Sequence, residues 1–190
     1  MAFDPRCLMP SGPRVARPAS RGWNSLKTVA QIAVMWGLLL GVLPLGIDLV
    51  ERWLGSPRLP ACPGLGAMLF AVASLLGLAT ANALVRDGEG TPLPLDTVRK
   101  LVVSGPYRHV RNPMAMFGFA QGFAVGLWLG SPAVLVYTAA GIMIWQGLAR
   151  PWEEADLERR FGDRYRCYRA AVHCWIPRLT PFTDDAVSPP

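Results

Sequence analysis

The fold is decided by the stretch from Asn112 to Ala149, which reads NPMAMFGFAQGFAVGLWLGSPAVLVYTAAGIMIWQGLA and contains no Asp, Glu, Lys or Arg. Two earlier stretches, 28–47 and 59–85, are also free of charged residues. A transmembrane helix needs roughly 20 mainly apolar residues to cross a hydrocarbon core about 30 Å thick. Because the stretch from Asn112 is long enough to cross twice, the sequence predicts four spanning helices, at 28–49, 64–85, 113–129 and 132–149.

A soluble helical protein is disfavoured, because its helices usually keep a polar stripe. The net charge of +6 would suggest a nucleic-acid partner for a soluble protein, but we expect none here. Lys and Arg gather instead in three segments, 6–27, 86–111 and 150–178, and the turn Gly130-Ser131-Pro132 carries no charge. By the positive-inside rule, the three basic segments face the cytosol. Both termini are therefore expected in the cytosol, and we expect the plasma (inner) membrane as the location.

The predicted fold class is all-α, an integral membrane bundle of about four helices followed by a cytosolic amphipathic helix. Pro44 is expected to kink the first span or mark its outer end, and Pro151 to interrupt the chain after the fourth. We expect the final helix to lie on the membrane surface or over the cytosolic mouth of the bundle. Its apolar residues recur at helical spacing: Leu157, Phe161, Tyr165, Tyr168 and Val172. Residues 1–22 and 179–190 are predicted to be disordered tails around a single domain, 23–178.

Glycine recurs at every fourth residue of the third span. Gly118, Gly122, Gly126 and Gly130 fall on one stripe of a helix. Such a stripe lets another backbone approach closely in lipid. The fourth span is the expected partner; a homodimer is compatible with the stripe but is not predicted.

Two charged clusters border the membrane on the same side, at 104–113 and 150–154. The third and fourth spans form a hairpin, so the clusters should meet at its open end. Glu154 falls in the apolar sector of the final helix, Glu153 lies at the edge of that sector, and a buried acid is costly unless paired. Arg111 and Arg150 are its expected partners. No metal site is predicted, because no cysteines are paired at ligand spacing.

Structural interpretations of the same residues stay open. Both glutamates suit the first turn of a helix, where the dipole favours acids. Asn112-Pro113 suits a helix start, and Arg108 and Arg111 suit lipid phosphates. A lone His109 is more often structural than catalytic.

The stretch 101–114, which reads LVVSGPYRHVRNPM, resembles the signature of the isoprenylcysteine carboxyl methyltransferase family, which is grouped with membrane phospholipid methyltransferases. The C-terminal part is similar too, with matching residues at Glu153, Glu154, Leu157, Phe161, Gly162, Tyr165, Tyr168, Val172 and 175–178. The resemblance covers about 86–178. It implies that this part binds S-adenosylmethionine and transfers its methyl group.

By motif position, the resemblance implies that the cofactor is held by Tyr107, His109, Arg111, Asn112, Pro113, Glu153 and Glu154. Apart from the resemblance, the chemistry of methyl transfer makes Glu154, Arg111 and Arg150 candidate catalytic residues. Either arginine could hold an anionic acceptor, and Glu154 could be the base for an amine or a hydroxyl. Its angular position on the helix makes Glu154 the expected essential glutamate. The acceptor is expected to be a lipophilic small molecule or a lipidated, membrane-associated carboxylate, thiol or amine, and membrane lipids are expected partners.

The chain departs from the family where members commonly carry a tyrosine and then a glycine. Those positions are Ala115 and Phe117 here, and the glycine is displaced to Gly118. The departure supports an alternative, a non-enzymatic membrane protein that kept the fold. A membrane reductase is a further alternative, which the short length of the chain disfavours.

Overall fold

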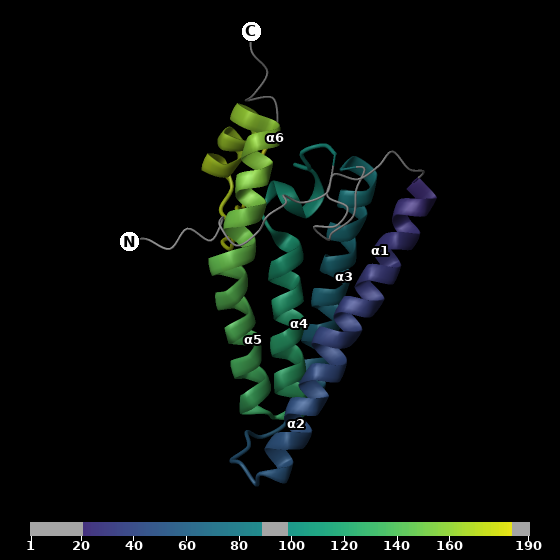
Figure 1. Cartoon of the computed structure of the whole chain (residues 1–190), viewed down its shortest axis with the longest axis vertical. Helices are drawn as coiled ribbons and strands as arrows, with labels where there is room; N and C mark the ends of the chain where they lie inside the picture. The colour runs from purple at the N-terminus through teal and green to yellow at the C-terminus, as the bar shows by residue number, and fades with distance from the viewer. Residues whose placement is uncertain (1–20, 89–98, 184–190) are drawn as a thin grey trace.

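The computed structural model describes residues 21–88 and 99–183, and within these ranges it contains helices and no strand. The predicted all-α class is therefore confirmed. Four helical rods run side by side (Figure 1). They comprise α1 (Arg21–Trp36), η2 (Gly37–Val42) and α2 (Leu43–Trp53); α3 (Pro63–Asp87); α4 (Pro113–Leu129); and α5 (Pro132–Ile144), η4 (Trp145–Ala149) and α6 (Arg150–Ala171). A short 3-10 turn, η3 (Gly105–Arg108), precedes α4.

Three of the rods contain apolar helix long enough to cross a membrane, and α4 is a shorter apolar helix of 17 residues. Many large apolar side chains on the rods are exposed, as expected of surfaces that face lipid, including Leu75 (69%) and Met143 (72%). The four rods correspond to the four predicted spans. Most of the predicted disordered tails, 1–22 and 179–190, lies outside the described residues. Phe182, placed in one of these tails, is instead buried.

Neither proline breaks its helix, so the predictions for Pro44 and Pro151 are wrong. The first rod continues through Pro44 to Trp53, and α6 continues the line of α5 through Pro151 (Figure 1). In both cases a π-helical turn ends two residues before the proline. Its wider backbone relieves the clash between a proline ring and the carbonyl four residues back. The turns thus let both rods continue.

The sharp bend in the last rod lies at Gly162 instead. Its φ of 53° and ψ of −130° suit glycine, which has no Cβ to clash in that region. The first half of α6 therefore stands along the line of α5 rather than flat on a surface, which corrects that part of the prediction. Beyond Gly162 the chain turns back, and Tyr165, Tyr168 and Val172 pack on Leu101.

Glycines set the distance between the rods. A Cβ on Gly122 would lie 2.8 Å from Oγ1 of Thr138, so α4 packs closely on α5 as predicted. A Cβ on Gly66 of α3 would lie 2.8 Å from the carbonyl oxygen of Ala124, in α4. The bundle therefore relies on close backbone approach, as helices in lipid commonly do.

A buried ion-pair network closes the end of the bundle opposite η3. Arg58 binds Asp48 (2.5 Å) and Glu51 (3.0 Å), and it donates to the carbonyl of Leu129 (2.7 Å). The other carboxylate oxygen of Glu51 accepts the backbone N–H of Ala133 (3.0 Å). The network ties α2 to the α4–α5 hairpin and so fixes the rods at this end.

Candidate functional site

The segment before α4 is held by the C-terminal segment through backbone hydrogen bonds. Arg111 N donates to the carbonyl of His173 (2.9 Å), and Arg178 N donates to that of His109 (2.8 Å). The Nδ1 atom of His109 lies 2.9 Å from the carbonyl oxygen of Arg178. His109, predicted to hold a cofactor, therefore joins two backbone segments in this structure.

Asn112 links the start of α4 to α6. Its Oδ1 accepts the N–H of Ala115 (3.1 Å), which caps the helix, and Pro113 occupies the first turn. Its Nδ2 donates to Glu153 Oε2 (3.2 Å). The structural and the functional interpretations of Asn112 thus apply together, because one amide serves both contacts.

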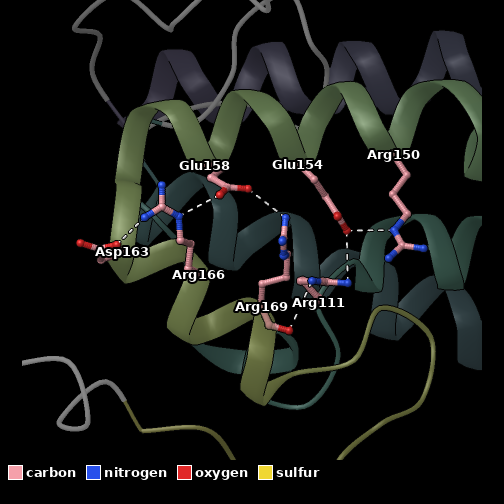
Figure 2. Close-up of polar contacts among 7 residues, drawn as sticks. All are labelled: Arg111, Arg150, Glu154, Glu158, Asp163, Arg166 and Arg169. Carbon is pink, nitrogen blue, oxygen red and sulfur yellow. Dashed lines mark hydrogen bonds and ion pairs between the residues drawn. The ribbon is translucent and has the colours of Figure 1, made fainter. Parts of the chain in front are cut away.

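Glu154 bridges two arginines, as its position in the sequence predicted (Figure 2). Its Oε1 lies 2.8 Å from Nε of Arg150 and 3.2 Å from Nη2 of Arg111. The Arg111 side chain is only 9% exposed. The two charged clusters of the sequence therefore meet at the open end of the α4–α5 hairpin, and a carboxylate compensates the buried cation there.

Glu153 is in a different environment, because no ion pair to its carboxylate occurs among the described residues. Burial raises its pKa to about 7, the amide of Asn112 lowers it, and the nearby charge of Glu154 raises it. Glu153 lies in α6 beyond the charge-free span, which ends at Ala149. A carboxyl group that titrates near neutrality in a cleft is a candidate for proton transfer.

A cavity of about 680 Å³ begins at this polar cluster and extends between the rods. Four of the predicted site residues line it: Tyr107, Arg111, Asn112 and Glu153. His109, Pro113, Arg150 and Glu154 do not line it. The structure thus divides the predicted site into residues that face the cavity and residues that support them.

Further polar and aromatic residues line the same end of the cavity but were not predicted as site residues. They are Asp156, Arg160, Tyr165 and Tyr168. Asp156 is 5% exposed and pairs with Arg159 and Arg160. The sequence did contain a signal for Asp156 and Arg160: residues 153, 156, 157 and 160 have the spacing of one face of a helix.

Two buried polar atoms at this end, Arg111 Nε and Tyr165 Oη, have no hydrogen-bond partner among the residues that the structure describes. Tyr165 is fully buried, and leaving a buried polar atom unpaired costs free energy. Both residues line the cavity. A guanidinium and a hydroxyl on residues that line one cavity suit an anionic group such as a carboxylate.

The cavity changes character away from the polar cluster. Its lining there is apolar and aromatic and comes from α1, η2, α4, α5 and η4, with Trp36, Phe119 and Trp145 among the rings. Ala115, one of the departures from the family pattern, also lines it, whereas Phe117 does not. One continuous space therefore joins a polar, charged end to an apolar end.

A model of the phospholipid methyltransferase family matches residues 62–164, which is more than half of the chain. The chain belongs to the phospholipid methyltransferase family. This match confirms the resemblance inferred from the sequence. No curated protein and no solved structure matches the chain. As a member of a family of membrane methyltransferases with several apolar helices of spanning length, the chain is an integral membrane protein.

Proposed function

We propose that this methyltransferase transfers a methyl group from S-adenosylmethionine to a lipophilic or membrane-associated acceptor, and that its polar end and both termini face the cytosol of the plasma (inner) membrane. The observation that carries the proposal is the cavity, which joins a charged end to an apolar end. The uneven distribution of Lys and Arg supports the orientation.

The residues at the polar end fit the amino-acid part of this cofactor. The guanidinium of Arg111, which lines the cavity, suits the carboxylate. The carboxyl group of Glu153 suits the ammonium group. The cofactor would supply an electrophilic methyl group on a sulfonium, a cation that aromatic faces and carboxylates attract.

The chain's own residues would orient the acceptor and keep water out. Tyr165 and Tyr168 cover the polar end, and both are buried. Methyl transfer needs the acceptor atom held close and in line, in a site without water. An anionic acceptor needs no base, whereas an amine must lose a proton. Glu153, whose pKa is about 7, is suited to accept one.

Calorimetry on the detergent-purified protein, with S-adenosylmethionine and separately with NADPH, tests the proposal. We expect micromolar binding of S-adenosylmethionine, lost in Arg111→Ala and weakened at least tenfold in Glu153→Ala. Glu158→Ala is the matched control, because Glu158 lies on the same helix but does not line the cavity. We expect it to bind like the wild type.

Failure of the folded protein to bind S-adenosylmethionine would refute the proposal. If NADPH also failed to bind, the alternative of a non-enzymatic membrane protein would be favoured. Ala115 supports this alternative. It lines the cavity at a position where members of the isoprenylcysteine carboxyl methyltransferase family commonly carry tyrosine. Binding of NADPH alone would favour a reductase.

A further inference from the structure

The apolar end of the cavity is a slot that runs into the membrane-spanning part of the bundle. Along α4 and its N-cap the lining extends from Asn112 to Gly122, and along the last rod it extends from Ala149 in η4 to Tyr137 in α5. At a rise of about 1.5 Å per residue these distances are about 15 Å and about 18 Å. The slot is therefore about half as deep as a hydrocarbon core of about 30 Å.

The slot lies where the first and last rods diverge. α1 and α5 spread apart toward the polar end of the molecule, whereas α2 packs against α5 at the opposite end (Figure 1). Trp36 forms one wall: its indole N–H donates to Gln121 (2.6 Å), which donates to Ser74 (2.8 Å). These bonds fix α1 against α4 and α3, so the wall has a defined position.

Tyr137 closes the slot below. Its hydroxyl donates to the carbonyl of Leu39 (3.1 Å), which joins α5 to the π turn of the first rod. That carbonyl lacks its usual partner, because Leu43 N–H donates to Leu38 instead and the residue after Leu43, Pro44, has no N–H. An otherwise unsatisfied carbonyl in the apolar part of the bundle is costly, so the contact is stabilising.

Below this level no room remains between the last rods. A Cβ on Gly122 would already overlap Thr138, and one turn further on, Gly126 lies directly against Leu135. This packing closes the α4–α5 side. Between the first rod and α5, a second cavity of about 620 Å³ lies beyond the floor, with Val42, Gly46 and Ala133 in its lining, so Tyr137 and Leu39 separate two spaces.

We propose that this floor limits the length of the hydrocarbon tail that the methyl acceptor can insert, so that Tyr137 is a specificity-determining residue. The inference rests on the proposed function, because it assigns the slot to the acceptor. The occupant is the acceptor's tail because the slot is continuous with the polar end, where the proposed cofactor would present its methyl group to the acceptor's head. The depth limits the tail to about half of the bilayer core.

The physical consequence is a break in how affinity depends on chain length. Each methylene that leaves water for the slot raises affinity about fourfold. Once the tail reaches the floor, a further methylene has no protein surface to bury against. Affinity should therefore rise with length and then level off or fall.

The test uses a homologous series of straight-chain primary alcohols, bound to the cofactor-free protein in detergent and measured by native mass spectrometry. Tyr137→Ala removes the floor, and the break should move to longer chains. Ala140→Phe places a ring in the slot about one turn higher, and the break should move to shorter chains. Ala140 lines the slot and is exposed, so the ring has space.

Two neighbouring substitutions serve as matched controls. Val136→Ala and Ala139→Phe change exposed residues of the same helix that do not line the slot, and both should leave the break unchanged. They separate an effect on the slot from a general effect on α5.

A break that stays fixed in both Tyr137→Ala and Ala140→Phe would overturn the proposal. So would an affinity that rises without a break, because the tail would then lie in the detergent or bilayer. Affinity independent of length would mean that a retained lipid or a second copy of the chain fills the slot, which would also overturn it. The test uses no cofactor, so it remains readable if S-adenosylmethionine fails to bind.

Discussion

Glu154 and Glu158 offer a comparison in which burial is the main difference. Each carboxylate lies on α6 and contacts two arginines, Arg111 and Arg150 for Glu154 and Arg166 and Arg169 for Glu158 (Figure 2). The arginines of Glu154 are 9% and 24% exposed, whereas those of Glu158 are 59% and 43% exposed. The perturbation is Glu154→Ala against Glu158→Ala.

The expected magnitude follows from the solvation of the arginines left behind. Removing one partner of a fully buried ion pair costs about 3–5 kcal/mol, because the remaining charge is uncompensated. Water reaches Arg150, and Arg111 keeps a long contact to the carbonyl of Arg169 (3.4 Å). We therefore expect Glu154→Ala to lose about 2–3 kcal/mol of unfolding free energy. Glu158→Ala should lose little, because exposed pairs are solvated and screened by salt.

The assay is unfolding in mixed micelles, titrated with a denaturing detergent and followed by circular dichroism, at low and high salt. The loss in Glu154→Ala should depend little on salt. If Glu158→Ala destabilised the protein as much as Glu154→Ala, then the burial of Arg111 would not decide the energetics, and the reasoning would be refuted.

Three further outcomes are expected. The free energy of unfolding of the wild type should fall by up to about 3 kcal/mol as pH rises from about 4.5 to about 7. In this window the folded state holds a proton on Glu153 that the unfolded state has released. When unfolding is measured across this pH range, Glu153→Gln should flatten the slope. Gly66→Ala should lower the free energy of unfolding by about 1–3 kcal/mol, because the new Cβ would meet the backbone of the facing helix. Gly64→Ala should leave it unchanged, because a Cβ there meets nothing within 4 Å. Equal melting temperatures for the two variants would contradict this. Arg58→Ala should destabilise the protein by about 2–4 kcal/mol, because it leaves the buried Asp48 without this partner. Arg52→Ala should destabilise it less, since the Arg52 side chain is 57% exposed. The reverse order in detergent unfolding would contradict the network described.

Much of the fold could be predicted from where charge is absent. A charge-free stretch has few alternatives to a spanning helix, and the glycine stripe on α4 correctly identified α5 as a close neighbour. The meeting of the two charged clusters followed from the hairpin alone, and the pairing of Glu154 with Arg111 and Arg150 followed from the place of Glu154 in an apolar sector of the helix. These predictions succeeded because each depended on composition or on a short connection.

The details that failed depended on backbone geometry that no local pattern encodes. The apolar sector of the final helix was drawn as one continuous face, but the bend at Gly162 separates Tyr165 and Tyr168 from the residues before it. In the first half of α6, the face toward the cavity therefore contains Glu153 rather than Glu154. Which of the two is essential stays a prediction. His109 faces the C-terminal segment because of contacts that are distant in sequence.

The π turn η4 sets the rotation of everything that follows it. Removing one residue there would restore ordinary α-helical spacing and rotate the first half of α6 by about 100° relative to α5. Glu153 would then no longer face the cavity. A Cβ on Gly147, within this turn, would meet nothing within 4 Å. Among homologues that keep this chemistry, the side chain at Gly147 should therefore vary freely, while the number of residues between the fourth span and the paired glutamates should not change.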